Sequence, residues 1–326
     1  MDALSEVLGQ IRLKGAVFLV GEFSAPWSVV TPDAGEACRA FMPQAEHLIL
    51  FHLVMSGRCQ ILVDGHPPQW VEADHAVILP HGARHRLASD AALAGRSVTE
   101  LLADADRHED VWMLRHGGGG EPCRVQCGFL ACDPQVAAPL LGSLPGVMVV
   151  SLREQGGLPW IPAMLEYAAA ETAAPSAGSG AALAKLSELL FVEAVRRHLQ
   201  SLSSHDSGWL AGLRDRVVAR TLALIHQDPA QDWTAETLAR SVGASRSVIS
   251  QRFSDLLQCP PMAYLTQWRM RMAAQMLRES SQSIERVAGQ VGYRSVAAFT
   301  RAFKRELGVT PARWRKGQGR ADIAGG

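Results

Sequence analysis

The sequence predicts a two-domain α+β fold, with a β-rich N-terminal part that also contains helices and an all-α C-terminal part. The chain has 326 residues, which exceeds one typical domain, and 48% of them are hydrophobic, which is ample for compact cores. Short β-rich runs separated by turns occupy residues 11–130. Helical periodicity dominates from residue 158 onward.

Charge is divided between the same two parts. The whole chain carries 32 basic and 32 acidic residues, but residues 209–326 contain 18 Lys and Arg against 9 Asp and Glu. The first 208 residues hold the opposite excess, 14 basic against 23 acidic. This asymmetry is expected when only one domain meets a polyanion. Two differently solvated surfaces are the alternative interpretation.

The chain lacks the marks of a membrane or secreted protein. Its apolar stretches are interrupted well before the roughly 20 residues that a membrane span requires. The acidic start, MDALSEVLGQ, does not resemble a secretory signal. Six cysteines in a chain of this length form no disulfide framework. We therefore expect a cytoplasmic protein with reduced thiols and no membrane contact.

The N-terminal part, residues 1–200, is predicted to be a β-barrel or sandwich at about 11–150, followed by helices at about 158–200. Asp64-Gly65 is typical of a hairpin, because Gly adopts the positive φ that tight turns demand. The helical segment carries an apolar stripe that is either core or a dimer seam. The expected strands are AVFLV, HLILFHLVMSG, CQILVDG, AVILPHG and CRVQCGFL, and the stripe is Leu183, Leu186, Leu190 and Ala194.

Polar residues 201–208 are expected to link this part to a second domain at 209–318, and residues 319–326 are expected to be a disordered tail. Within the second domain, residues 234–253 and 283–303 repeat one pattern at an offset of 49 to 50 residues. Each repeat has a helical segment, a short Gly-containing turn and a second helical segment, which is the helix-turn-helix arrangement. Two such units predict contact with double-stranded DNA.

Each helix of the repeat has its own start signal, because Thr234, Ser245, Ser283 and Ser295 are good N-caps. Ile249 and Phe253 in the first unit, and Phe299 and Phe303 in the second, are expected in the core. The remaining positions point outward, where Gln suits adenine, Arg suits guanine, and Val or Ala suits a thymine methyl. Arg and Ser near the helix starts hold phosphates in the alternative interpretation. The expected DNA-contacting residues are Arg246, Ser247, Ser250, Gln251, Arg294, Ser295, Val296, Ala297, Thr300, Arg301 and Lys304.

One amphipathic helix is predicted to join the two units, because apolar residues recur every four positions along YLTQWRMRMAAQML. A rigid joint would fix the spacing of the two recognition helices at about one helical turn of DNA, roughly 34 Å.

The segment VAGQVGYRSVAAFTRAFKRELGVTPARWR resembles the C-terminal signature of the AraC/XylS family of transcription regulators, and the resemblance spans about residues 213–316. It implies recognition helices in successive major grooves, with base-edge roles for Ser247, Ser250, Gln251, Val296, Ala297, Thr300 and Arg301. It also implies action as an activator together with RNA polymerase. Gln258 departs from the pattern, because relatives usually carry Gly there. This predicts a helix that ends with strain or ends differently.

In the N-terminal part, PHGARH at residues 80–85 resembles the second motif of cupin barrels, and residues 40–150 resemble the cupin-type sensor of one AraC branch. Ala73 stands where that motif usually has Gly. Enzymatic cupins hold a metal through a His-x-His pair, a Glu and a later His. This chain has no His-x-His, and its His47 and His52 are five residues apart. A catalytic metal site is therefore not expected, and no cofactor is required.

Three interpretations of the N-terminal part stay open: a small-molecule pocket, a metal or thiol-redox sensor, and a structural or dimerising barrel. The sensor would favour zinc, because thiolate and imidazole suit that ion. The residues it would use are His52, His81, His85, Cys123 and Cys127.

The sequence thus predicts a DNA-binding transcription regulator and not an enzyme. Its expected partners are promoter DNA, an unknown small-molecule or redox effector, RNA polymerase, and a second copy of the chain. A cupin metalloenzyme, an isomerase or dioxygenase, fused to a nucleic-acid-binding module is the alternative from another class. A non-specific nucleic-acid or scaffold protein is the third.

Overall fold

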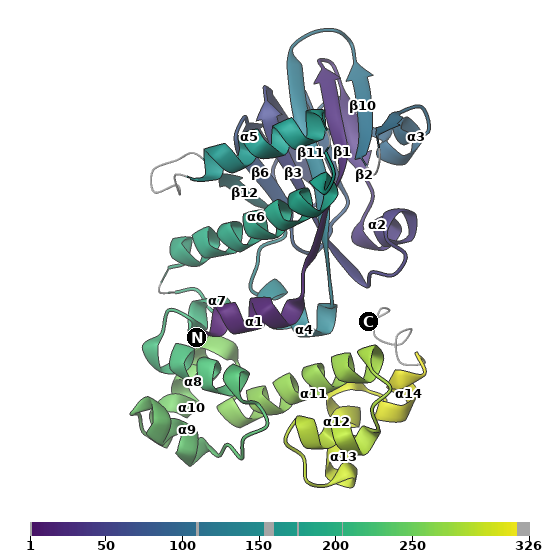
Figure 1. Ribbon diagram of the computed structural model, residues 1–326. Helices are drawn as coiled ribbons and strands as arrows, with labels where there is room; N and C mark the ends of the chain where they lie inside the picture. Colours follow the sequence, from purple (N-terminus) through teal and green to yellow (C-terminus); the bar gives the residue numbers. More distant parts are fainter. Residues whose placement is uncertain (1, 109–110, 153–159, 175, 204, 318–326) are drawn as a thin grey trace. The chain divides into compact units, whose positions relative to one another are not determined.

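The computed structural model describes residues 2–108, 111–152, 160–174, 176–203 and 205–317 (Figure 1). The chain divides into two compact units. The sheet unit comprises residues 13–132 and 144–201, and the helical unit comprises residues 1–12, 133–143 and 202–326. Two short segments of the predicted sensor region thus belong to the helical unit. The predicted disordered tail, residues 319–326, lies outside the described residues.

The described strands of the sheet unit form two sheets, whose hydrogen-bonded orders are β12-β6-β3-β11-β1-β10-β9 and β5-β4-β7-β2-β8. Neighbouring strands are antiparallel except for β1 with β10 and β2 with β8. The strands are β1 (Lys14–Ser24), β2 (Ser28–Thr31), β3 (His47–Ser56), β4 (Arg58–Val63), β5 (Gln69–Glu72), β6 (His75–Leu79), β7 (His85–Ala88), β8 (Arg96–Ser97), β9 (Asp106–His108), β10 (Val111–Gly117), β11 (Pro122–Cys132) and β12 (Met148–Ser151).

Of the two predicted architectures, a closed barrel is not formed, because these two sheets do not join into one cylinder among the described residues. The edge strands β8 and β9 have only two and three residues, which is too short to continue a hydrogen-bond ladder around a barrel. The sandwich alternative fits instead. All five strands expected from the sequence are found, and Gly65 has a φ of 78° in the turn between β4 and β5.

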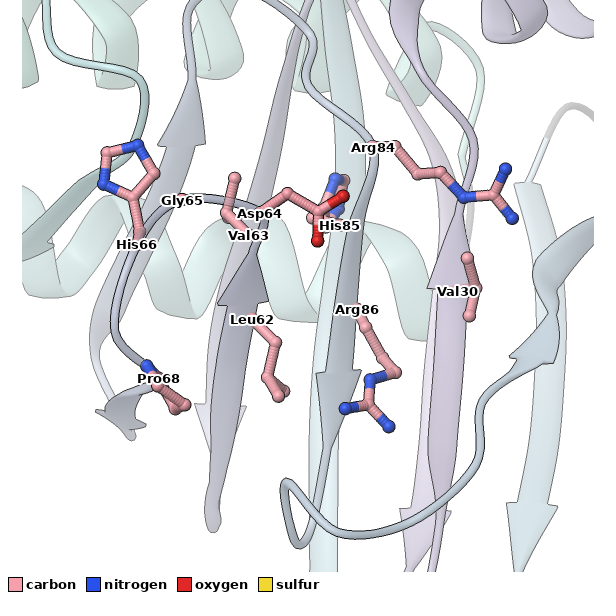
Figure 2. Close-up of a pocket in the computed structure, with 10 residues that line it drawn as sticks. All are labelled: Val30, Leu62, Val63, Asp64, Gly65, His66, Pro68, Arg84, His85 and Arg86. Atoms are coloured by element: carbon pink, nitrogen blue, oxygen red, sulfur yellow. The ribbon is translucent and has the colours of Figure 1, made fainter.

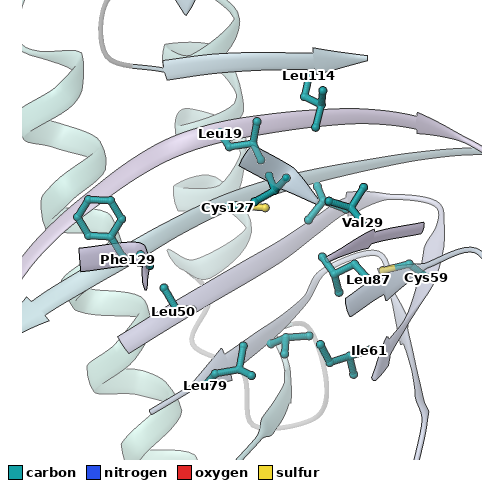
Figure 3. Close-up of a cluster of buried hydrophobic side chains, with 14 of the residues drawn as sticks. Leu19, Val29, Leu50, Cys59, Ile61, Leu79, Leu87, Leu114, Cys127 and Phe129 are labelled. Atoms are coloured by element: carbon teal, nitrogen blue, oxygen red, sulfur yellow. The ribbon is translucent and has the colours of Figure 1, made fainter. Parts of the chain in front are cut away.

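The main core lies between the two sheets (Figure 3). Leu19, Leu50 and Phe129 come from the seven-stranded sheet, and Ile61 and Leu87 come from the five-stranded sheet. All five are at most 5% exposed. Alternating side chains of each strand reach this core, as expected when two sheets pack face to face.

Helices α5 (Trp160–Ala173) and α6 (Ser179–Ser201) lie on the other face of the seven-stranded sheet (Figure 1). The backbones of β1 and α6 approach closely at Gly15, where a Cβ atom would lie 2.5 Å from the carbonyl oxygen of Ala184. The α6 stripe packs toward the sheet, with Leu183 and Leu190 at 3% and 4% exposure. The stripe is therefore core, and it is not a free dimer seam.

Two further helices of the sheet unit, α2 (Ala34–Phe41) and α3 (Val98–Leu102), were not expected from the sequence. Asp33 caps α2 by accepting a hydrogen bond from the backbone N–H of Glu36. The N-cap signal was therefore present.

The helical unit is built around α11, the predicted joining helix, with α8–α10 around one end and α12–α14 around the other (Figure 1). All four predicted N-caps are confirmed, because each side chain accepts a backbone hydrogen bond from the first turn of its helix. The helices are α7 (Trp209–Gly212), α8 (Arg216–Gln227), α9 (Ala235–Val242), α10 (Arg246–Leu257), α11 (Pro261–Glu279), α12 (Ile284–Gln290), α13 (Val296–Leu307) and α14 (Pro311–Arg315).

Two helices from earlier in the sequence, α1 (Ala3–Ile11) and α4 (Pro134–Leu141), complete the helical unit. The buried face of α1 packs on α8, and α4 packs on α11. Arg12, just after α1, pairs with Glu279 of α11 at 2.9 Å. Asp133, which caps α4, pairs with Arg278. Directly along the chain, α1 leads into β1, and β11 leads into α4.

Candidate nucleic-acid interface and sensor cluster

The turn between α9 and α10 follows from its residue types. Gly243 ends α9 with a φ of 71°, a conformation that Gly adopts at little cost. The hydroxyl of Ser245 then accepts from the backbone N–H of Val248 and starts α10. Ile249 and Phe253 are fully buried, as predicted, and they fix which face of α10 remains outside.

The pair α12 and α13 follows the same plan 50 residues later. Gly292, with a φ of 83°, lies in the turn, and the hydroxyl of Ser295 caps α13. Phe299 and Phe303 are fully buried, as predicted, and Trp314 of α14 packs edge-on against Phe303.

The residues predicted to meet DNA lie on the outer faces of α10 and α13 or just before α13. Ser250 and Thr300 are half-buried, and the others are exposed. Val248 and Ser254 are also exposed on α10, and the sequence analysis missed both. The offset of 50 residues could have found Ser254, since it aligns with Lys304. The exposed members are Arg246, Ser247, Gln251, Arg294, Ser295, Val296, Ala297, Arg301 and Lys304.

These residues differ in their partners within the chain. Among the described residues, the side chains of Arg246, Arg301 and Lys304 have no hydrogen bond or ion pair. In contrast, the Gln251 amide donates to Asp255 at 2.7 Å, and Arg294 pairs with Asp232. The faces of α10 and α13 can therefore offer three free cations to an anionic surface.

In the sheet unit, three of the five predicted sensor residues come together in the core. The Nδ1 atom of His52 lies 2.9 Å from the Sγ atom of Cys127, and its Nε2 atom lies 2.5 Å from Nε2 of His85. The Nδ1 atom of His85 faces the carbonyl of Ala83 at 2.8 Å. These contacts join β3, β7 and β11, and thus join the two sheets.

The hydrogen bonds of this cluster fix its protons. A carbonyl only accepts, so Nδ1 of His85 donates to Ala83 and Nε2 of His85 accepts from Nε2 of His52. His52 then accepts the thiol proton of Cys127 at Nδ1. Every ring nitrogen is used while both imidazoles and the thiol stay neutral.

Burial favours the same neutral state. Desolvation, with a smaller contribution from His85, holds the pKa of His52 well below its usual value. Desolvation also lowers the pKa of His85 to about 4. The pKa of Cys127 is raised, chiefly by burial. A neutral thiol is a poor metal ligand and a poor nucleophile.

The other two predicted sensor residues lie apart from this chain of hydrogen bonds. His81 is exposed, and its Nε2 atom lies 3.2 Å from the carbonyl of Leu144. Cys123 instead shares a hydrogen bond with Cys59, which raises the pKa of the Cys59 thiol, and burial raises it further. Cys59 was not predicted, because its partner lies far away in the sequence on the opposite sheet. Within the described residues, no three His, Cys, Asp or Glu side chains are arranged to hold a metal ion.

A pocket beside this cluster has a volume of about 410 Å³. Its walls are β2, the end of β4 and the turn after it, and the start of β7. Figure 2 shows Asp64 and His66 from the turn, with Arg84, His85 and Arg86 along the neighbouring segment. His85 therefore belongs both to the pocket wall and to the buried hydrogen-bond chain.

Comparison with known proteins identifies both parts of the chain. A family model described as "Cupin" matches residues 2–200, and one described as "Helix-turn-helix domain" matches residues 238–317. A putative AraC-like transcription regulator of Streptomyces antibioticus is 32% identical over 322 residues, covering 97% of this chain and 99% of the relative. The transcriptional regulator AlkR of Acinetobacter baylyi is 27% identical, with the same two coverages. The activator RclR of Escherichia coli, named as RCS-specific, is 24% identical over 97% of this chain and 98% of its own.

Among solved structures, the DNA-binding domain of the global transcriptional factor AdpA in complex with a target DNA is 32% identical to this chain. It covers 34% of this chain and 99% of its own, with a TM-score of 0.31. No described helix is long and apolar enough to cross a membrane. The relatives that span the chain are transcription regulators, so the protein is not an enzyme. The chain belongs to the AraC family of helix-turn-helix transcription regulators and carries an N-terminal cupin domain.

Proposed function

We propose that α9–α10 and α12–α13 are two helix-turn-helix units and that α10 and α13 enter successive major grooves of promoter DNA. The observation that supports this most is the 50-residue repeat of caps, turn and buried aromatics, which leaves matching faces exposed. A second helix with an exposed polar face suits groove entry. The joining helix α11 keeps the two faces at a fixed spacing.

Roles within the two faces follow from side-chain chemistry. Arg301 and Gln251 read base edges, as do the smaller residues on the two helices. Arg246 and Lys304 hold phosphates, since both are exposed cations without a partner among the described residues. Arg294 must exchange Asp232 for phosphate, and the hydroxyl of Ser295 remains a cap. The smaller base-reading residues are Ser247, Ser250, Val296, Ala297 and Thr300.

Selection from a random DNA pool tests the twin-reader model. The full-length protein at near-physiological salt should enrich a site with two short blocks about one helical turn apart, roughly 34 Å. Binding that shows no preferred sequence would instead support a non-specific nucleic-acid protein. A single enriched block would mean that only one helix pair reads bases.

The effector is proposed to be a small molecule that binds in the 410 Å³ pocket beside His85 and needs no metal or other cofactor. A neutral hydrogen-bond chain leaves no imidazole lone pair for a metal, which argues against the zinc alternative. Such a ligand changes promoter occupancy only if it binds two arrangements of the protein with different affinity. Dialysis against EDTA should leave the melting temperature and the DNA affinity unchanged, and loss of either would restore the metal hypothesis.

Activation through RNA polymerase is proposed on the resemblance to named activators such as RclR. A homodimer in the cytoplasm is also proposed. The exposed apolar residues Tyr167 and Leu189 on α5 and α6 are candidates for its contact. Sedimentation equilibrium with and without DNA tests the dimer, and a monomer in both conditions would exclude it.

A further inference from the structure

The helical unit contains a cavity of about 200 Å³ that the DNA-binding function does not use. Its walls come from the end of α4, from α7, and from the loop between α10 and α11 together with α11 itself. The lining residues that matter below are Ser143, Trp209, Cys259, Tyr264, Gln267 and Arg271.

Arg271 is the cation of this cavity. The side chain is partly buried, and among the described residues it makes no hydrogen bond or ion pair. Burial lowers its pKa, although Glu306 and the Tyr264 phenol oppose the shift. Because Arg271 lines the cavity and its side chain is free of partners, the guanidinium can pair with an anion that enters there. The amide of Gln267, beside it in the wall, likewise has no hydrogen-bond partner among the described residues.

The aromatic wall of the cavity is held in place by hydrogen bonds. The indole N–H of Trp209 donates to the Tyr264 hydroxyl at 2.8 Å, and that hydroxyl lies 2.7 Å from Nε2 of His226. The hydroxyl of Ser143 accepts from the backbone N–H of Trp209 at 2.8 Å. Pro139 and Leu257 add apolar surface. The wall is therefore shaped in advance for an apolar body.

We propose that this cavity binds a small organic carboxylate, whose anionic group meets Arg271 and Gln267 and whose apolar body lies against Trp209 and Tyr264. One cation and one amide suit a single negative charge, because Arg pairs carboxylates through two parallel N–H donors. A phosphate with two charges would be left half-compensated. A mostly apolar wall with a few polar groups is the usual composition of a ligand site.

The bound carboxylate would contact two segments of the chain: one from the region that the cupin model matches, and one from the DNA-binding region. Ser143 lies just after α4, which directly follows β11 in the chain, whereas Arg271 lies on the helix that joins the two helix pairs. Occupancy would hold α4 on α11 more firmly, since a ligand stabilises the state that binds it. The site is separate from the pocket beside His85.

Alkylation of Cys259 supplies the test, because this thiol lines the cavity and the other five cysteines are buried. Benzoate is the probe and benzamide is its neutral control, each at about 10 mM, which nearly saturates a site with a millimolar Kd. The full-length protein is treated with iodoacetamide, and mass spectrometry follows the Cys259 peptide. Benzoate should slow labelling roughly tenfold if its Kd is near 1 mM, and benzamide should not.

Matched variants assign the effect to the cavity. Arg271→Gln should abolish protection by benzoate, whereas Arg220→Gln, an exposed arginine on α8, should retain it. Should Arg271→Gln fail to fold, Gln267→Leu decides the question, because it should weaken protection while leaving the charge in place.

Three results would overturn the proposal: no protection by benzoate, equal protection by benzoate and benzamide, or unchanged protection in Arg271→Gln. None of these readouts involves DNA, so they are independent of the proposed groove contacts.

Discussion

The two helix pairs share one plan and differ in what their exposed residues are free to do. On α13, Arg301 and Lys304 have no partner among the described residues, whereas on α10 the corresponding positions are Gln251 and Ser254. Gln251 is moreover tied to Asp255. The repeat fixes which positions on α10 and α13 are exposed. The side chains at those positions determine how strongly each helix binds DNA. The second pair offers two free cations, Arg301 and Lys304, whereas the first pair offers one, Arg246, beside neutral readers.

The cores under the two pairs differ as well. The second pair packs on an apolar cluster that includes Phe299, Phe303 and Trp314. Under the first pair, the buried His226 ring lies 4.2 Å from the Trp268 ring and hydrogen-bonds the Tyr264 hydroxyl. A buried imidazole resists protonation, so the first pair alone carries an acid-sensitive core.

The largest expected effect tests whether the two cores unfold separately. Phe253→Ala and Phe303→Ala should each lower the free energy of unfolding by about 3–5 kcal/mol, because both rings are fully buried. Hydrogen exchange should then show α8–α10 losing protection in Phe253→Ala while α12 and α13 keep theirs. Phe303→Ala should show the reverse.

Phe253→Leu is the matched control for the first substitution, since it keeps most of the apolar volume and should cost less. Equal loss of protection across both pairs in either alanine variant would mean that the helical unit unfolds as one body. The two cores would then not differ in their free energies of unfolding.

Next in size is the effect on DNA binding. Arg301→Ala should weaken binding to the selected site by about 1–3 kcal/mol and relax base preference at one position. Gln251→Ala should cost less, because Gln251 must first leave Asp255. Fluorescence anisotropy with matched and mismatched duplexes measures both. A uniform loss on all sequences for Arg301→Ala would make it a phosphate contact.

Lowering the pH should reduce the free energy of unfolding of the first core, and not of the second, by a similar amount. Burial, aided by the charge of Arg271, lowers the pKa of His226 to about 3, whereas an unfolded His titrates near 6.5. The unfolded state therefore binds more protons between these values, and stability falls as pH drops through this window. The loss is about 1.4 kcal/mol per pH unit below 6.5, or about 2 kcal/mol at pH 5.

Hydrogen exchange at pH 7 and pH 5, corrected for intrinsic rates, should locate this loss in α8–α10. Tyr264 and Arg271 face the same ring, but both keep their charge state over this range. His226→Gln removes the titration and should flatten the dependence for the first pair. Equal acid sensitivity of α12 and α13 would contradict the assignment.

The sequence predicted the helical part well because its signals are local. Each N-cap, each turn glycine and each buried aromatic acts within one or two helical turns, so a 50-residue repeat makes them visible. The strands were found for a similar reason, since alternating apolar residues and turn signals are short-range.

What the sequence could not predict depends on contacts between distant strands. Nothing near His52 indicates that its two neighbours will be His85 and Cys127, because strand order and register bring them together. The same holds for α1 and α4. Their caps at Asp2 and Asp133 are readable, but their packing on the helical unit is not.

The smallest predicted effect tests the two helix ends that differ by one residue type. Gln258 ends α10 with a φ of 55°, the left-handed conformation that the glycine at the matching position 308 adopts with a φ of 76°. A left-handed conformation costs a residue with a Cβ atom roughly 1 kcal/mol. Gln258→Gly should therefore stabilise the protein by about 0.5–1 kcal/mol, and Gly308→Gln should destabilise it by about the same amount. A Cβ atom at Gly308 would have nothing within 4 Å, so backbone strain alone is measured there. Urea unfolding gives both values, and a change of the same sign in the two variants would show that strain at the helix end is not what separates the pairs.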